Sequence, residues 1–247
     1  PVHANTSTTS KVQSEHKKLA QVSEGRQRLP SLLVDFKAEL QSSSNFVFRG
    51  DTTYAVSGLI NLGGTTTIEG GAVVKYTNSG TAKIVCSGPI VCNTGPFRPA
   101  VFTSMDDCTV GDTIVNGTPS GYYGNPALEI RTGNQYLHDV RVAHAAVGFF
   151  FYDYSANTDN LISDVQIVDC DKAIKANGYT TTFQRVALRN ALIHNVDTAL
   201  YGYSFTGRVE HLTLHQCNKL AYDYNGTNYG TSSSLFLTNS LLVSVTN

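Results

Sequence analysis

Apolar and polar positions alternate with a long period in the C-terminal half of the chain. Five segments can be aligned so that mostly apolar residues, two positions apart, are followed by a polar residue and then by a small or apolar one. The segments start at Val140, Val165, Ala191, Leu212 and Ser240, with spacings of 25, 26, 21 and 28 residues. Such spacings are typical of solenoid repeats, and apolar residues two positions apart indicate strands and not helices.

Each segment contains a polar residue where the first strand should stop. These residues are His144, Asp169, Asn195, Gln216 and Ser244, and in the first four segments a second short strand begins a few residues later. A strand, a turn, a second strand and a returning loop describe one coil of a parallel β-helix, whose adjacent coils pair about 4.8 Å apart. We therefore predict an all-β fold over residues 45–247, a single-stranded right-handed parallel β-helix.

Shorter strands are predicted before this repeat. They fall at 46–48, 54–56, 59–62, 66–68 and 73–76, and again at 83–85, 90–91 and 100–102. The glycine pairs 63–64 and 70–71 predict tight corners with positive φ. We expect these strands to form the first coils, with three stacked pairs: Ile60 with Ile84, Ile68 with Val91, and Val74 with Val101.

The N-terminal segment has different patterns. Residues 1–10 form a Ser/Thr/Asn-rich stretch without periodicity and are predicted to be a flexible tail. Across residues 11–44 apolar residues, among them Leu19, Leu33 and Phe36, follow a helical stripe. An amphipathic helix lying across one end of a solenoid would cover its unpaired strand edges. We therefore predict an α-helical cap over residues 11–44, with an arm that packs on a neighbouring molecule as the alternative.

The repeat and its polar turn residue resemble the pectate-lyase-like superfamily of secreted β-helices, whose asparagine ladder would correspond to the mixed polar residues in this chain. Residues 64–71 and 99–111 are also similar to segments of large, mostly uncharacterised secreted bacterial β-helix proteins. The resemblance implies the β-helix fold. It assigns no catalytic residue, because one scaffold carries many activities.

The composition indicates where the protein is expected to be located and excludes some classes of partner. The net charge is −1 and 15% of the residues are charged, so we expect no binding to nucleic acid. No apolar run reaches the roughly 18 residues that a membrane-spanning helix needs, so no membrane span is expected. Many Ser, Thr, Asn, Gly and Tyr residues with few charges favour a secreted or cell-surface protein. Sequons at Asn5, Asn116 and Asn225 would matter in a source that glycosylates.

The chain contains five cysteines. Cys86 and Cys92 are close enough in sequence for a local disulfide, which would suit an oxidising compartment; two small buried thiols are the alternative. Cys170 and Cys217 fall in one column but two coils apart. Two coil steps separate their Cα atoms by about 9.6 Å, beyond the roughly 7 Å that a disulfide spans, so both are expected to be reduced core residues.

Carboxylates in one loop are the candidate metal ligands. Asp106, Asp107 and Asp112 could hold Ca²⁺, and no other cofactor is expected. The alternative is a solvated turn in which these side chains cap backbone amides. His194 and His215 should be adjacent in one outward column, where a stack of surface histidines is favoured over a zinc or copper site.

The outward positions of the first strand test for an active site. They read Arg141, Gln166, Leu192, Thr213, Leu241 in one column and Ala143, Val168, His194, His215, Val243 in the next. Neither column contains the acidic pair that polysaccharide hydrolases use. We therefore predict no catalytic residue and expect the protein not to be an enzyme.

Aromatic residues dominate the outward positions of the second strand. Alternation with inward residues such as Phe149 and Ile174 predicts a broad aromatic face. Its members are Phe150, Tyr152, Tyr154, Tyr179, Tyr201, Tyr203, Phe205, Tyr222 and Tyr224. An apolar surface of this size should be covered by a partner.

The last coil, residues 235–247, carries no helix, charged strand or proline that would protect its edge, and open strand edges invite pairing. We therefore predict a secreted, non-enzymatic structural protein that assembles with copies of itself, laterally or as a filament, through this coil and the aromatic face. The alternative is an extracellular carbohydrate-binding surface module with a polysaccharide as partner. A polysaccharide lyase is less favoured.

Overall fold

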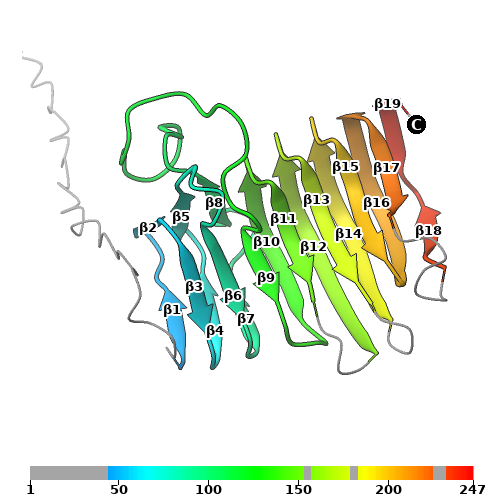
Figure 1. Ribbon diagram of the computed structural model, residues 1–247, viewed down its shortest axis with the longest axis horizontal. Coiled ribbons are helices and arrows are strands. Elements are labelled where there is room, and N and C mark those ends of the chain that lie inside the picture. Colours follow the sequence, from blue (N-terminus) through cyan, green and yellow to red (C-terminus); the bar gives the residue numbers. More distant parts are fainter. Residues whose placement is uncertain (1–43, 153–156, 179–182, 225–231, 247) are drawn as a thin grey trace, which may run out of the picture.

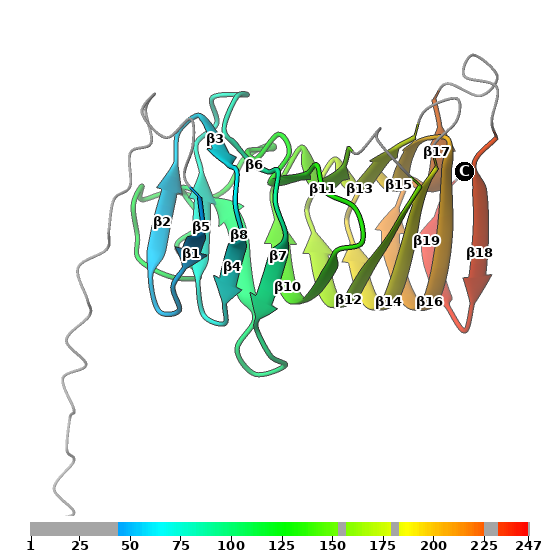
Figure 2. The same ribbon diagram turned by 90° about the horizontal axis from the view of Figure 1, so that it is seen from below.

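The computed structural model describes residues 44–152, 157–178, 183–224 and 232–246. Within these residues the chain winds into a parallel β-solenoid without helices (Figures 1 and 2). Two of its three sheets run along the long axis, and the third, three-stranded sheet belongs to the first coils. The all-β solenoid prediction is confirmed for this part of the chain, and none of its elements is a long apolar helix able to cross a membrane. The predicted flexible tail and nearly all of the predicted helical cap or arm lie outside the described residues.

The three sheets are built from parallel strands that recur once per coil. Sheet I contains β1 (Phe46–Phe48), β4 (Thr66–Glu69) and β7 (Ile90–Asn93). Sheet II contains β2 (Thr53–Val56), β5 (Val73–Tyr76), β8 (Ala100–Ser104), β10 (Tyr136–Ala143), β12 (Thr158–Val168), β14 (Gln184–His194), β16 (Phe205–Cys217), β18 (Ser234–Thr238) and β19 (Leu241–Val245). Sheet III contains β3 (Leu59–Leu62), β6 (Lys83–Cys86), β9 (Leu128–Ile130), β11 (Val147–Phe151), β13 (Lys172–Asn177), β15 (Thr198–Tyr203) and β17 (Lys219–Asp223).

The columns predicted from the long repeat are confirmed by the strand register. Their inward residues stack between coils because each strand pairs with the equivalent strand of the next coil. The pairs are Val140 with Val165, Val165 with Ala191, Ala191 with Leu212, and Leu214 with Leu242.

The first coils follow the prediction less closely. Ile60 pairs with Ile84 as expected. Ile68 pairs with Cys92, and Val74 with Phe102, so the other two predicted pairs are wrong by one residue. In the first of these pairs Val91 points outward and is 43% exposed although it is apolar, and the inward position falls to the next residue, Cys92. In the second pair Val101 aligns with Val73, and the buried Phe102 takes the inward position.

Two rows of mostly polar residues adopt the left-handed backbone conformation, which Asn and Asp tolerate better than most residues. The row predicted from the repeat is His144, Asp169, Asn195, Gln216 and Ser244, with φ between 52° and 56°. A second row was not predicted and bends β10, β12, β14 and β16 in their middle; it comprises Asp139, Asp164, Asn190 and His211, with φ between 48° and 57°. Hydrogen bonds join neighbouring side chains within each row: Asn190 Nδ2 donates to Asp164 Oδ1 (2.6 Å) and Asn195 Nδ2 to Asp169 Oδ1 (2.7 Å).

The glycine pairs of the first coils have two different roles. Only Gly71 adopts the predicted positive φ, at 84°. Gly70 is required by close packing, because a Cβ atom added there would lie 2.3 Å from the carbonyl oxygen of Arg98. Gly63 has no atom within 4 Å of an added Cβ, so neither reason applies to it.

The loop after β8 is anchored on the outer surface of sheet II by a buried lysine. Lys75, with 0% exposure, donates from Nζ to the backbone oxygens of Asp107 (2.7 Å) and Asp112 (2.6 Å). Burial lowers the pKa of Lys75. Asn116 is exposed in this loop, whereas the sequons at Asn5 and Asn225 lie outside the described residues.

All five cysteines are free thiols, so the structure does not form the predicted bridge between Cys86 and Cys92. Cys86 lies in β6 of sheet III with its side chain in the core, whereas Cys92 lies in β7 of sheet I. Burial raises the pKa of Cys86 to about 12, and that of Cys170 to about 12. Cys170 and Cys217 are buried and unpaired, as predicted.

Candidate functional site

The outer surface of sheet III gathers aromatic and basic side chains from β11, β13, β15 and β17. Phe149, Ile174 and Leu200 point into the core with at most 3% exposure, so the residues that follow them point outward. One outward row, in register, is Glu129, Phe150, Lys175, Tyr201 and Tyr222. We call the surface around this row the tyrosine–lysine face; it consists of Phe150, Tyr152, Lys172, Lys175, Tyr201, Tyr203, Lys219, Tyr222 and Tyr224.

Three lysine ammonium groups lie over aromatic rings of this face. Nζ of Lys175 is 4.5 Å from the ring centroid of Phe150, and Nζ of Lys172 is 5.0 Å from that of Tyr201. Nζ of Lys219 is 4.6 Å from the ring centroid of Tyr222. These distances are those of cation–π interactions. The face therefore combines apolar rings and positive charges at close range.

The tyrosine rings also contact one another across the strands. Tyr201 stacks on Tyr224 with 4.7 Å between centroids and on Tyr222 with 5.9 Å, while Tyr203 meets Tyr224 edge-on at 5.1 Å. Tyr224 donates from its hydroxyl to Oδ1 of Asn177 (3.2 Å), and burial raises its pKa. Tyr222 is 45% exposed and Tyr203 is 8% exposed. Tyr222 is thus an accessible contact ring, and Tyr203 supports its neighbours from below.

A buried carboxylate lies at the other end of the row. Glu129 accepts hydrogen bonds from Nζ of Lys83 (2.8 Å) and Nε of Arg131 (2.7 Å). Burial raises the pKa of Glu129, but these two hydrogen bonds outweigh burial and hold the pKa below its ordinary value. Arg131 also lies over the ring of Tyr152, 5.7 Å from its centroid. Glu129 is therefore a fixed anion that orders the edge of the face.

The three lysines of the face differ in their charged neighbours. Lys172 contacts Oδ2 of Asp171 at 2.5 Å. Lys175 and Lys219 form no ion pair with any residue that the structure describes. Burial lowers the pKa of Lys175, and the charge of Lys172 lowers it further. An anion placed between these ammonium groups would relieve their mutual repulsion.

The structure brings together six of the nine predicted aromatic residues, namely Phe150, Tyr152, Tyr201, Tyr203, Tyr222 and Tyr224. Tyr154 and Tyr179 lie outside the described residues. Phe205 does not lie on this face: it is 3% exposed, belongs to the core and starts β16 of sheet II. The alternation that placed it outward is reset at Ser204, which adopts a φ of 50°.

The sequence pattern did not identify Lys172 and Lys219 as part of this face. They occupy the first positions of β13 and β17, where alternation of inward and outward residues places them on the inward side. They align through Thr198, in one row with Val147, which is 8% exposed. A charged residue directly after a turn can still reach the surface, because its long side chain extends beyond the end of the strand. That signal could have identified both lysines.

The predicted Ca²⁺ ligands do not form a cluster. Oδ atoms of Asp107 accept hydrogen bonds from Thr103 Oγ1 (2.7 Å) and from Thr109 N (2.9 Å), and Asp106 Oδ2 accepts one from the Tyr123 hydroxyl (2.6 Å). In the described residues no group of three His, Cys, Asp or Glu side chains, Asp112 included, could hold a metal ion. The capping role that was the alternative describes Asp107 better.

The predicted histidine stack is present on the outer surface of sheet II. His194 pairs with His215, and their rings stack with 4.9 Å between centroids and 3.0 Å between the two Nδ1 atoms. A hydrogen bond between two Nδ1 atoms requires one of them to donate and the other to accept. His211 lies on the same strand, β16, four residues before His215, and belongs to the second row of left-handed residues.

Comparisons with known proteins add no family to this geometry. No protein-family model matches the chain, and no curated protein or solved structure matches it significantly.

Proposed function

We propose that this chain is a non-enzymatic, carbohydrate-binding solenoid that holds an acidic polysaccharide on the tyrosine–lysine face. The observation that carries the proposal is the placement of Lys172, Lys175 and Lys219 over the rings of that face, 4.5 to 5.0 Å from the centroids. Sugar rings present C–H groups that pack on aromatic rings, and their carboxylate or sulfate groups form charge-assisted hydrogen bonds with ammonium groups.

Charge favours a polyanion over a second copy of the chain at this face. Two copies related by a two-fold axis would bring the same patch together, so Lys175 and Lys219 would face lysines of the other copy. Like charges across an interface cost free energy. An acidic polysaccharide instead repeats its negative charges along the row of coils.

We propose that the polysaccharide is bound on this face and not cleaved. Glu129, the carboxylate in the row of the face, is held as an anion by Lys83 and Arg131, and its pKa is lowered. A general acid or base needs a pKa near the working pH. Glu129 is thus suited to ordering the face and not to proton transfer.

A comparison of an acidic with a neutral polysaccharide tests the proposal. In titration calorimetry, we expect polygalacturonate to bind and dextran, a neutral polymer of similar size, not to bind. The affinity should fall as salt is raised from 0.05 to 0.5 M, because the Debye length shortens to roughly a few ångströms. Equal affinity for dextran, or an affinity independent of salt, would contradict the proposal. Release of unsaturated products that absorb in the near ultraviolet would contradict binding without cleavage.

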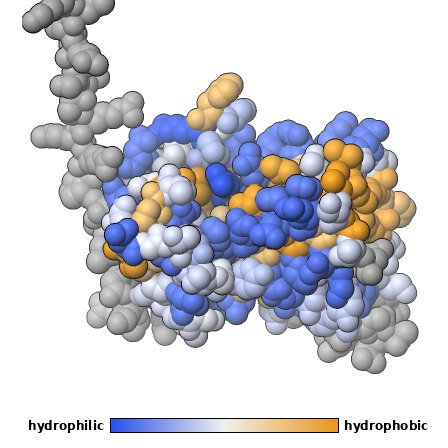
Figure 3. All heavy atoms as spheres, turned by 90° about the horizontal axis from the view of Figure 1, so that it is seen from above, coloured by the Kyte–Doolittle hydropathy of each residue, from blue (hydrophilic) through white to orange (hydrophobic). Residues whose placement is uncertain are grey.

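Assembly with further copies is a second candidate, favoured by the outermost described coil. In β18 and β19, Phe236, Leu241 and Leu242 are 59%, 59% and 42% exposed, and apolar side chains gather at this end of the solenoid (Figure 3). Leu242 stacks on Leu214 and would be covered by a further coil. We propose that a second copy of the chain supplies that further coil. We also propose that the coils of the solenoid are right-handed and that the protein is secreted and of the pectate-lyase-like type. An experimental structure of an assembled form tests the handedness.

Sedimentation velocity tests the assembly candidate. We expect the wild-type chain to associate with rising concentration and Leu242→Lys to stay monomeric, because the substitution places a charge where an apolar surface must be covered. Thr246→Lys, at an exposed position beyond β19, is the control and should associate like the wild type. A wild-type chain that is monomeric at all concentrations would remove this candidate.

A further inference from the structure

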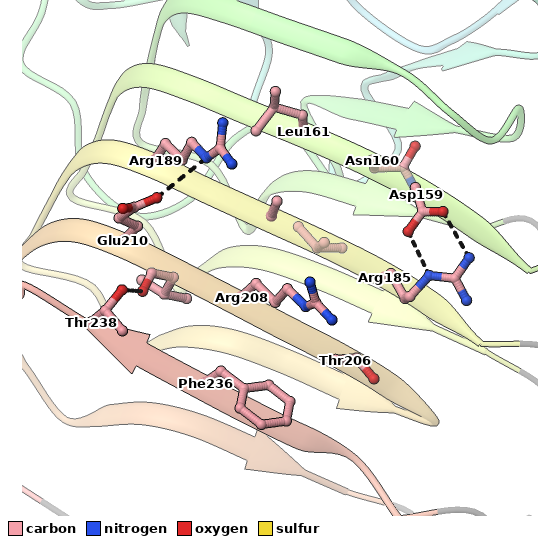
Figure 4. Close-up of a pocket in the computed structure, with 13 residues that line it drawn as sticks. Asp159, Asn160, Leu161, Arg185, Arg189, Thr206, Arg208, Glu210, Phe236 and Thr238 are labelled. Carbon is pink, nitrogen blue, oxygen red and sulfur yellow. Dashed lines mark hydrogen bonds and ion pairs between the residues drawn. The ribbon is translucent and has the colours of Figure 1, made fainter.

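A groove of about 640 Å³ lies on the outer surface of sheet II, on strands that do not contribute to the tyrosine–lysine face. It crosses the first halves of β12, β14 and β16 and reaches Phe236 and Thr238 of β18 (Figure 4). Side chains from one row across these strands form its floor and ends. The row, in register, is Leu161, Ala187, Arg208 and Phe236.

The hollow results from the sizes of these residues. Ala187 ends at its Cβ atom, between the larger Leu161 on one side and Arg208 on the other. Phe236 follows Arg208 and is 59% exposed, so its ring forms an accessible apolar wall. The groove is therefore apolar along its floor and has one cation beside an aromatic ring.

Two ion pairs lie on either side of this row, and they are formed by the other charged residues of the groove. Arg185 donates from Nε to Oδ1 of Asp159 (2.5 Å) and from a terminal nitrogen to Oδ2 (2.7 Å). On the other flank, Nε of Arg189 is 3.5 Å from Oε2 of Glu210. Each carboxylate of the groove thus has its own arginine.

Arg208 is the arginine of the groove that pairs with neither of these two carboxylates. It is exposed and forms no hydrogen bond or ion pair with any residue that the structure describes. Figure 4 shows its guanidinium on the groove side of β16, without an interaction to the other labelled residues. The hydrogen bonds from Arg185 lower the pKa of Asp159, and the charges of Arg185 and Arg208 lower it further, which agrees with a guanidinium close to this carboxylate.

We propose that this groove binds a small organic monoanion, a carboxylate attached to a flat apolar body. The carboxylate pairs with the guanidinium of Arg208, a geometry that can be bidentate. The apolar body lies over Ala187, next to Leu161, and the ring of Phe236 borders Arg208 on its other side. The three arginines exceed the two carboxylates by one charge, so one negative charge is matched, whereas a second would meet Asp159 or Glu210.

The site differs from the tyrosine–lysine face in the ligand that it selects. A polyanion such as an acidic polysaccharide needs repeated cations, and only one of the three arginines of the groove, Arg208, has no carboxylate partner among the described residues. Its size exceeds that of a single six-membered ring, so a bicyclic acid is a suitable probe. The inference does not depend on the polysaccharide proposal.

The test uses 2-naphthoate as the probe, followed by its own fluorescence in 0.15 M salt. We expect saturable binding that is absent for 2-naphthalenemethanol, which lacks the charge, and for acetate, which lacks the rings. Arg208→Gln should weaken binding about tenfold, equivalent to ~1.4 kcal/mol, and Phe236→Ala should weaken it several-fold. Arg141→Gln, at another exposed arginine of sheet II, is the matched control and should leave the affinity unchanged.

Four results would overturn the inference. They are no saturable binding of 2-naphthoate, equal binding of the neutral alcohol, an equal loss with Arg141→Gln, and loss of binding when the three lysines of the tyrosine–lysine face are replaced. The last result would place the acid on that face instead. Arg208 and Phe236 are exposed, so their variants should unfold at the wild-type temperature, and this is checked by circular dichroism.

Discussion

Replacing Gly202 by alanine should destabilise the C-terminal coils more than any surface substitution in this chain. Gly202 lies in β15 and pairs with Ala176 of β13. A Cβ atom added at Gly202 would lie 1.8 Å from the carbonyl oxygen of Ala176, which is backbone and cannot rotate away. Either the strands separate or β15 shifts, and both disrupt the ladder between two coils. We expect a loss of about 3 kcal/mol or more in the free energy of unfolding, the range of strained buried sites.

Urea unfolding followed by circular dichroism measures this loss. Gly63→Ala is the matched control, because an added Cβ there has no atom within 4 Å and Gly63 does not adopt positive φ. Its effect should stay within about 1 kcal/mol and can be stabilising, since alanine restricts the unfolded chain. Equal midpoints for both variants would show that β13 and β15 do not approach as closely at Gly202 as the structure has them.

The fold could be predicted from the sequence where the repeat is long and regular. From Val140 onward, inward apolar residues and a polar turn residue recur together, and both are required by the same coil geometry. The turn residue must tolerate positive φ, and the residues before it must fill the core. Asp169 and Asn195 satisfy the first condition, and the register of Val165 with Ala191 the second.

The remaining features depend on contacts that no local pattern encodes. Val91 is apolar but outward, so the predicted pairing of Ile68 was wrong by one residue. Phe205 follows a bend at Ser204 that reverses the inward and outward positions. The row of left-handed residues that bends β12 and β14 lies directly before the repeat, where an Asp or Asn next to an apolar residue resembles any turn.

The two proposed binding surfaces could be only partly predicted from the sequence. Alternation identified Tyr201 and Tyr222, because aromatic residues at outward positions are conspicuous. It missed Lys172 and Lys219 at strand starts. The groove was missed because Arg185 and Arg208 lie in the first halves of β14 and β16, upstream of the segments that the repeat defines.

Neutralising the lysines of the tyrosine–lysine face should abolish most of the affinity for an acidic polysaccharide. The variant Lys172→Gln/Lys175→Gln/Lys219→Gln keeps long polar side chains but removes the three ammonium groups that lie over the rings. A charged hydrogen bond contributes roughly 1.5–3 kcal/mol, so the loss of three should reduce affinity by more than about 100-fold, or ~2.7 kcal/mol. Binding of the wild type should also weaken at alkaline pH, and Lys175 contributes first, because burial lowers its pKa.

The most direct measurement compares this variant with one that loses the same charge elsewhere. Arg98→Gln/Arg141→Gln/Arg189→Gln also removes three positive charges, from residues outside the tyrosine–lysine face. Calorimetric titration with polygalacturonate should give near-wild-type affinity for the arginine variant and a loss of more than about 100-fold for the lysine variant. Equal losses in the two variants, or a lysine variant that binds like the wild type, would contradict the claim that the tyrosine–lysine face holds the polysaccharide.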